Sequence, residues 1–173
     1  MDAPVSGGVR GAVAAKLAIL TGGERGLVDA CDELLSVMGR RLYVGPLGSG
    51  HAAKSLNNYV SAAGLAAASE AVIIAQRFGI SPEVMTDVLN ASTGRNNSTE
   101  NKFKQFILNK TYGAGFTLGL MTKDIGLAME VADALHVPAE LGHACLKLWK
   151  DAEGTLSGKA DHTAIIKHLG DLP

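Results

Sequence analysis

The sequence predicts a mainly α-helical protein in which a short α/β segment precedes an all-helical body. Two apolar runs bounded by glycines lie at 17–23 and 40–45, and a segment of helical periodicity separates them. After residue 50 every apolar pattern has helical spacing. Only 5% of the residues are aromatic although 47% are hydrophobic, so the core must consist of closely packed aliphatic side chains. We therefore place a domain boundary between segments 1–47 and 48–173.

The α/β segment is expected to run strand, helix, strand. Residues 3–6 should be extended, because a proline disfavours helix at the residue before it, and the glycines within 7–11 predict a turn. The strand at 17–23 leads into a helix that ends at Gly39, and the strand at 40–45 follows. Two strands make a poor sheet by themselves. We therefore expect them to need partner strands that this chain does not contain.

The helical body is expected to begin with a helix from about residue 51 to 78, which would be about 42 Å long. Gly79 ends it, and Ser81 with Pro82 has the N-cap and first-position pattern of a new helix that runs to about residue 91. A polar loop at 93–99 and a glycine-containing loop at 109–116 flank a short helix. The remaining predicted helices are 100–108, 117–135, 138–149 and 162–169.

Composition excludes several classes of function. The formal net charge is −1 and the basic residues are scattered, so neither nucleic acid nor an anionic membrane is an expected partner. Cys31 and Cys145 lie far apart, which is typical of a reducing cytoplasm, and the five dispersed histidines predict no metal site. The most apolar window, 59–76, contains Glu70 and many alanines, so we interpret it as a core helix and not as a membrane span.

One polar stripe lies on the long helix. Lys54, Asn57, Asn58 and Ser61 stand at i, i+3, i+4 and i+7, whereas the other faces are almost wholly apolar. This pattern favours a buried helix whose polar stripe faces a cleft, where a lysine is a candidate acid or base. The alternative is that Lys54 extends to solvent near the helix N-terminus, beside two surface asparagines. Spacing alone does not decide between these interpretations.

Three further segments have a functional and a structural interpretation. Residues 48–53, GSGHAA, match G-x-G-x-x-A, the dinucleotide-binding motif. That motif requires a second strand ending in an acid about 20 residues later, and none follows here. A tight turn that directs a helix N-terminus at an anion is therefore the better interpretation. Ser6, Gly7 and Gly8 offer a hydroxyl and backbone amides for a carboxylate, or form only a turn. Lys123 and Asp124 are adjacent and should not face each other. One of them points into a cleft, or both lie on a solvated edge.

Taken together, three segments resemble the β-hydroxyacid dehydrogenase family. They are DAPVSGG at 2–8, GxGxxxKxxNN at 48–58 and KDxxLA at 123–128. The family includes 3-hydroxyisobutyrate dehydrogenase, tartronate semialdehyde reductase, glyoxylate/succinic semialdehyde reductase and, more distantly, 6-phosphogluconate dehydrogenase. The resemblance implies a Rossmann-type nucleotide-binding domain followed by a helical domain that closes the active site and forms the dimer. Residues 1–47 would be the last part of the first domain, and 48–173 the helical catalytic domain.

The resemblance also implies roles for single residues. Lys54 is similar to the family's catalytic lysine and Asn58 to its partner. Ser6, Gly7 and Gly8 match the positions that bind the substrate carboxylate, and Asn58 and Asp124 match positions that line the same pocket. For the cofactor, Lys123 and Phe116 match positions that contact NAD or NADP.

The implied activity is an NAD(P)-dependent oxidation of a small β-hydroxyacid such as 3-hydroxyisobutyrate, or reduction of the matching semialdehyde. The expected partners are a small carboxylate and a second copy of the chain, in a homodimer or higher oligomer, in the cytoplasm. Because the chain has no complete G-x-G-x-x-G motif followed by a strand and an acid, we do not expect it to bind the cofactor or turn over by itself. Two alternatives therefore stay open: a non-catalytic helical dimerisation or ligand-binding module, and a truncated enzyme complemented by another chain.

Overall fold

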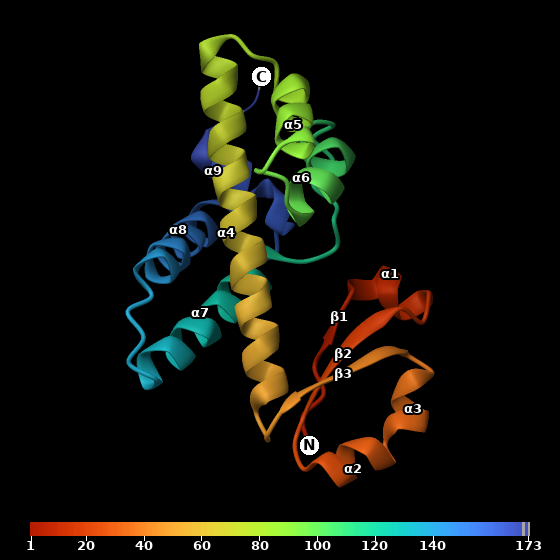
Figure 1. The fold of residues 1–173 in the computed structure, drawn as a ribbon. Coiled ribbons are helices and arrows are strands. Elements are labelled where there is room, and N and C mark those ends of the chain that lie inside the picture. Colours follow the sequence, from red (N-terminus) through yellow and green to blue (C-terminus); the bar gives the residue numbers. More distant parts are fainter. Residues whose placement is uncertain (171, 173) are drawn as a thin grey trace. The chain divides into compact units, whose positions relative to one another are not determined.

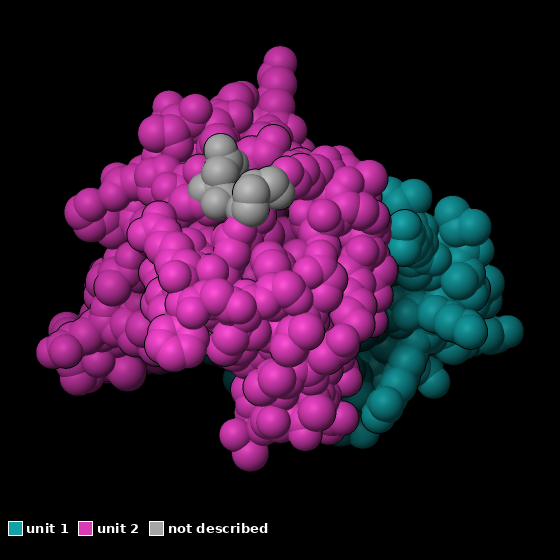
Figure 2. Space-filling model, turned by 90° about the horizontal axis from the view of Figure 1, so that it is seen from above, with its two compact units in different colours: residues 1–57 teal, residues 58–173 magenta. Residues whose placement is uncertain are grey.

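The computed structural model describes residues 1–170 and 172, which fall into two compact units (Figures 1 and 2). The first unit is Met1–Asn57 and the second is Asn58–Pro173. The first contains a small sheet with short helices, and the second is helical. This arrangement confirms the predicted fold class. The division falls inside the long helix, some ten residues after the predicted boundary, so the first turns of that helix are described with the sheet.

The sheet has three strands in the order β1-β2-β3. β1 (Val5–Ser6) is antiparallel to β2 (Leu17–Gly22), with Val5 opposite Ile19. β3 (Gly39–Gly45) runs parallel to β2, with Leu17 opposite Gly39. The two longer strands lie where the apolar runs predicted them, and the short extended segment before Gly7 supplies the third. A small cluster of Leu17, Ile19 and Leu35 forms the core of this unit.

Two local predictions in the sheet unit were wrong. Residues 7–11 do not form a simple turn, because Gly7 at φ +127° leads directly into a short helix, α1 (Gly8–Val13). The predicted helix before Gly39 is two helices, α2 (Arg25–Ala30) and α3 (Asp32–Ser36), which break at Cys31. Asp29 and Asp32 flank the break, and both bind Arg41 of β3. These ion pairs give the broken helix a direct attachment to the sheet.

The helix α4 (Ser49–Phe78) begins against the sheet. The Asp2 carboxylate accepts hydrogen bonds from the backbone amides of Gly48 and His51, each 2.8 Å long. Gly50 must lack a side chain, since a Cβ there would overlap the carbonyl oxygen of Leu20 and the Asp2 carboxylate. These contacts are anion capping of a helix N-terminus, which stabilises the first turn. The glycine-rich sequence before α4 therefore serves close backbone packing.

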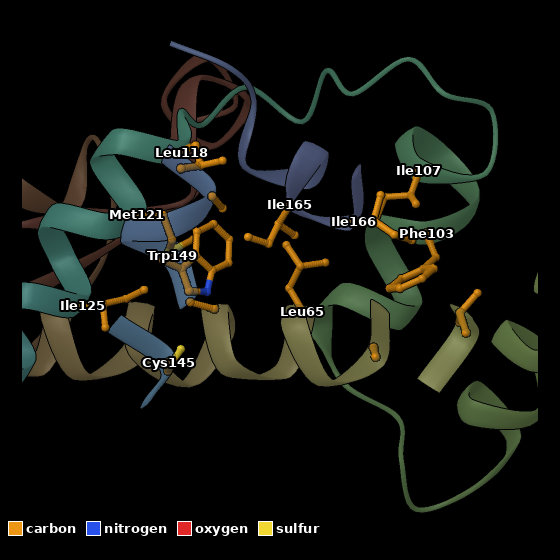
Figure 3. Packing of buried hydrophobic residues seen from close by; sticks show 14 of the residues in the cluster. Leu65, Phe103, Ile107, Leu118, Met121, Ile125, Cys145, Trp149, Ile165 and Ile166 are labelled. Atoms are coloured by element: carbon orange, nitrogen blue, oxygen red, sulfur yellow. The ribbon is translucent and has the colours of Figure 1, made fainter. Parts of the chain in front are cut away.

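The helical unit packs its core between α4, α7 (Leu118–Ala134), α8 (Glu140–Leu156) and α9 (Ile165–Leu169) (Figure 3). Trp149 of α8 is fully buried and lies beside Leu65 of α4 and Ile165 of α9 in this view. The tail helix begins as a single 3₁₀ turn, η2 (His162–Ala164). α7 begins one residue after its predicted start at Thr117, which is its N-cap, whereas α8 continues seven residues past its predicted end at Trp149.

The segment between α5 (Pro82–Ala91) and α7 is more ordered than its polar sequence predicted. Ser81 caps α5 as expected. Within the predicted loop, Asn96 forms a capping box with Thr99 and starts α6 (Asn97–Asn101), and its amide also donates to the Gly64 carbonyl of α4. The predicted helix at 100–108 is instead the end of α6 and a π-helix, η1 (Phe103–Ile107). Side-chain capping thus converts a polar run into a fixed structure.

The sequence predicted that the long helix is buried apart from its polar stripe, and the structure corrects this: some of its apolar residues are exposed. Val60, Ile74 and Phe78 are 66%, 67% and 84% exposed. In the described residues α4 is the one helix long and apolar enough to cross a membrane, and half of its apolar window is buried inside the structure. Core helices of soluble proteins have the same length and composition, so this feature is weak evidence of a membrane span.

Candidate functional site

The polar stripe of α4 is narrower in the structure than in the sequence. Asn58 is buried, Lys54 and Ser61 are half-buried, and Asn57 is exposed. Residues 54, 58 and 61 follow one another at successive turns of the same helix. The functional stripe therefore consists of an amine, an amide and a hydroxyl, and Asn57 lies to one side of it.

Asn58 and Asp124, which both resemble site positions, meet in the helical unit. The amide nitrogen of Asn58 donates a 2.6 Å hydrogen bond to Oδ2 of Asp124 on α7. The other carboxylate oxygen of Asp124 lies 3.4 Å from Nζ of Lys123. Our expectation that adjacent charges would not meet was wrong, because the long lysine side chain turns back to its neighbour. The Lys123 side chain is still 61% exposed, so it is available to an anion from solvent.

A second lysine, which the sequence analysis did not single out, also contacts the stripe. Nζ of Lys102 donates to Oγ of Ser61 at 3.3 Å. Burial lowers the pKa of Lys102 to about 8, although the negative charge of Asp161 acts in the opposite direction. In the sequence this residue resembles any solvated lysine of a charged helix, and only the folded chain brings it to α4. The spacing of the apolar residues around it does not indicate this contact.

Phe116 is positioned by a network around Asp161. The Asp161 carboxylate accepts from the backbone amides of Gly115, Phe116 and Thr163, and from the Thr163 hydroxyl. Burial opposes its ionisation, but hydrogen bonds from His162, Thr163 and Gly115 hold the pKa of Asp161 far below its usual range. Nδ1 of His162 donates to the backbone carbonyl oxygen of Phe116 at 3.0 Å, and the two rings meet edge-on with their centroids 5.9 Å apart. An Asp-x-Thr capping pattern before the tail helix was the available sequence signal.

The predicted carboxylate-binding residues lie in the sheet unit. Ser6 is half-buried at the end of β1, and Gly7 and Gly8 are exposed where α1 begins. The first amides of a helix have no partner within the helix, so amides from this turn can bind an anion. The structure therefore gives these positions hydrogen-bond donors of the right type, and the binding role stays a prediction.

Two other chemistries find little support in the described residues. Within residues 1–170 and 172, no group of three or more histidine, cysteine or acidic side chains is placed to bind a metal ion. Burial raises the pKa of Cys145 to about 11, so its thiol stays protonated at neutral pH and is a poor nucleophile.

Comparison with known proteins identifies the family. A sequence profile described as "NAD-binding of NADP-dependent 3-hydroxyisobutyrate dehydrogenase" matches residues 48–169, and one described as "NAD binding domain of 6-phosphogluconate dehydrogenase" matches 1–45. The fold and these matches define a chain of the NAD(P)-binding dehydrogenase class. More specifically, the chain belongs to the β-hydroxyacid dehydrogenase family, to which 3-hydroxyisobutyrate dehydrogenase also belongs.

Individual relatives agree with this assignment. The chain is 33% identical to 2-(hydroxymethyl)glutarate dehydrogenase of Eubacterium barkeri, over 96% of this chain and 56% of the relative. It is 35% identical to the mitochondrial 3-hydroxyisobutyrate dehydrogenase of Drosophila melanogaster, over 95% and 53%. A structure of Mycobacterium tuberculosis 3-hydroxyisobutyrate dehydrogenase with L-serine has a TM-score of 0.89 and 32% identity, over 98% of this chain and 60% of that one. The chain therefore spans about half the length of the curated relatives it matches.

Proposed function

We propose that the chain provides the substrate-binding and proton-transferring part of an NAD(P)-dependent β-hydroxyacid dehydrogenase. In this proposal residues 1–47 are the last part of the nucleotide-binding domain and 48–173 are the helical catalytic domain. The observation that carries the proposal is that α4 sets the buried Asn58, hydrogen-bonded to Asp124, one turn after Lys54. A buried amide held by a second helix is a rigid neighbour for a lysine that must exchange a proton with substrate.

The names of the relatives supply a common chemical unit for the substrate. 3-Hydroxyisobutyrate, 2-(hydroxymethyl)glutarate and L-serine are all acids of the form HOCH2–CH(R)–COO⁻, and they differ in R. We propose this hydroxymethyl acid, or the aldehyde formed from it, as the substrate class. 3-Hydroxyisobutyrate, in which R is a methyl group, is the reference member of this class.

Lys54 acts in this mechanism as the general acid and base. In oxidation its neutral amine takes the hydroxyl proton while a hydride leaves the carbon that bears the hydroxyl. In reduction its ammonium returns the proton to the carbonyl oxygen. Asn58 keeps the reacting oxygen beside the amine, and its bond to Asp124 fixes the orientation of its own amide. Ser6, Gly7 and Gly8 donate to the substrate carboxylate.

The hydride is accepted or donated by the nicotinamide of NAD or NADP when that cofactor is bound. The helical unit has residues that suit such a ligand. Lys123 offers an exposed ammonium to a phosphate, and Phe116 offers an apolar ring that the Asp161 network holds in place. These residues do not by themselves choose between the two cofactors.

Self-association is part of the same proposal. Exposed Val60 and Ile74 lie fourteen residues apart on the same face of α4, so the helix carries an apolar strip within the helical unit. We propose that a second copy covers it in a homodimer or larger oligomer. The compartment is a separate matter: some relatives are named as mitochondrial, and a cytoplasmic location stays the prediction from the two separated cysteines.

The test is nicotinamide absorbance with a series of HOCH2–CH(R)–COO⁻ acids and with both cofactors. The chain is assayed alone and within the longest open reading frame that contains it. Lys54→Ala should lower kcat by about 10²–10⁴-fold, the usual contribution of general acid–base catalysis. Ser6→Ala should mainly raise KM. Lys147→Ala is the matched control, because this exposed lysine of α8 pairs with Asp151 and should leave both constants unchanged.

The outcomes separate the possible functions. Turnover that Lys54→Ala leaves intact would remove Lys54 from the mechanism. Equal losses of kcat in Lys54→Ala and Ser6→Ala would contradict the division of roles. If no acid reacts with either cofactor in the complete reading frame, a non-catalytic helical module becomes the better description.

A further inference from the structure

Lys102 differs from the other paired lysines of the helical unit in what it contacts. Lys104, Lys123 and Lys147 are exposed, and each forms an ion pair with a carboxylate. Lys102 is buried more deeply, yet the hydroxyl of Ser61 is the hydrogen-bond partner of its amine, and it forms no ion pair with any carboxylate in the described part of the chain. A partly buried ammonium with a neutral partner is costly to maintain.

Asp161 acts on Lys102 at longer range than an ion pair, which requires a nitrogen–oxygen distance of about 4 Å or less. Asp161 influences Lys102 through its charge, but both of its carboxylate oxygens are already used. One accepts from the amide and hydroxyl of Thr163, and the other from the amides of Gly115 and Phe116. Asp161 is therefore committed to holding its own loop. The amine of Lys102 can therefore still donate directly to a further anion.

The local backbone fixes Lys102 in this place. The amides of Phe106 and Ile107 both donate to its carbonyl oxygen, at 2.9 and 3.2 Å, where the π-helix η1 begins. Single π-helical turns are frequent at functional sites. Fully buried Phe103 and Ile107 anchor this turn in the core. The lysine is thus presented to Ser61 from a rigid base.

The position of Ser61 relates Lys102 to the proposed substrate. Ser61 follows Asn58 by three residues on α4, a rise of about 4.5 Å along the helix. That distance is comparable to a chain of three carbon–carbon bonds of about 1.5 Å each. A substituent R that extends past Asn58 from the α-carbon, the neighbour of the reacting carbon, would bring its end group to Lys102.

We infer that Lys102, together with Ser61, binds a second carboxylate carried by the substituent R, so that the preferred substrate is a β-hydroxydiacid. This inference rests on the proposed function and names the substrate class within it. Lys102 is here a residue of specificity, and Lys54 carries out the proton transfer. Because its amine is hydrogen-bonded to a neutral hydroxyl, Lys102 can donate to a carboxylate without breaking an existing ion pair.

The experiment measures binding first, so that it does not depend on turnover. Isobutyrate, glutarate and inorganic phosphate are titrated by calorimetry against the chain, with and without NAD and NADP. Glutarate should bind at least about 10-fold more tightly than isobutyrate, as one added charged hydrogen bond predicts. Lys102→Met should abolish this preference. Lys104→Met, which removes an exposed lysine two residues away, should retain it, and Lys102→Arg should retain part of it.

Each result decides the inference. Equal affinity for the two acids, no binding of either, tighter binding of phosphate than glutarate, or a preference that survives Lys102→Met would overturn it. If Lys102→Met fails to fold, NMR of ¹³C-labelled lysine in the unmodified chain gives the answer, because glutarate must shift the Lys102 signal and isobutyrate must not. A glutarate preference without turnover of any hydroxyacid would support the inference while removing the proposed function. Turnover of monoacids without a preference for diacids would support the proposed function and overturn the inference about Lys102.

Discussion

The helical unit and the sheet unit are stabilised in different ways. The core of the helical unit includes Trp149 and Phe103, neither of which has exposed surface. The core cluster of the sheet unit is formed by Leu17, Ile19 and Leu35, and much of its remaining structure depends on strand pairing and on surface ion pairs to Arg41. A large apolar core tolerates the cost of burying polar groups. This comparison explains why the buried amide and the buried lysine both lie in the helical unit.

The largest expected effect comes from removing the centre of the helical core. Trp149→Ala should destabilise the helical unit by about 3–5 kcal/mol, the usual cost of deleting a buried aromatic side chain. Hydrogen exchange measured residue by residue would locate the effect. Amides of α7 and α8 should lose protection, while those of β2 and β3 should change much less.

The matched control for this change is Leu141→Ala. Leu141 lies on the same helix and is 70% exposed, so its truncation should alter stability by no more than about 0.5 kcal/mol. If Trp149→Ala lowered protection equally in both units, the units would unfold as one, and the comparison between them would be wrong.

The two units also differ in how far the sequence predicted them. Periodicity located both long strands, α4, α5 and α7, because apolar burial imposes that spacing on the chain. It placed a short helix at 100–108 but missed the start of α6 at Asn97 and the π-helical form of residues 103–107, since these depend on the capping by Asn96 and on tertiary packing of the π-helix. Of the site, the resemblance selected Asn58 and Asp124, which the structure brings together. Lys102 could not be predicted, because its significance comes from contacts made across the fold.

The second prediction concerns the cost of burying Lys102. Its pKa is lowered to about 8 in the folded chain, whereas the usual value is 10.5. Below pH 8 the amine is charged in both states, so the full penalty of burial acts on the folded state. As the pH rises from about 8 to 10.5, the folded chain loses this proton while the unfolded chain keeps it, and the penalty disappears.

Lys102→Met should therefore stabilise the protein by roughly 2–3 kcal/mol at pH 7, and the gain should shrink as the pH rises through that interval. Asp161, the neighbouring charge, stays ionised throughout and does not change the sign. Urea unfolding of the two proteins at pH 7, 8.5 and 10 measures the difference. A destabilised variant at pH 7 would mean that Lys102 serves as a structural partner of Asp161.

The smallest expected effect lies in the sheet unit, at the N-terminus of α4. Burial acts against the ionisation of Asp2, but hydrogen bonds from the amides of Gly48 and His51 and the charge of His51 lower its pKa. Asp2 thus contributes stability above its unfolded pKa of 3.8, and this contribution is lost as the pH falls through its lower folded value. Asp2→Ala removes an acceptor that resembles a helix N-cap, which typically costs about 1 kcal/mol. Glu33→Ala, an exposed acid of α3, serves as the control.

Asp2→Ala also tests whether the start of α4 belongs to the sheet unit. If it does, the amides of the sheet and of residues 49–57 should lose protection together, while those of α8 keep theirs. If amide hydrogen exchange increases only near residue 2, with no change at the start of α4, the glycine-rich turn before α4 holds this helix in place without the Asp2 carboxylate. Since Lys54 lies within that first part of α4, a loosened start should also lower kcat.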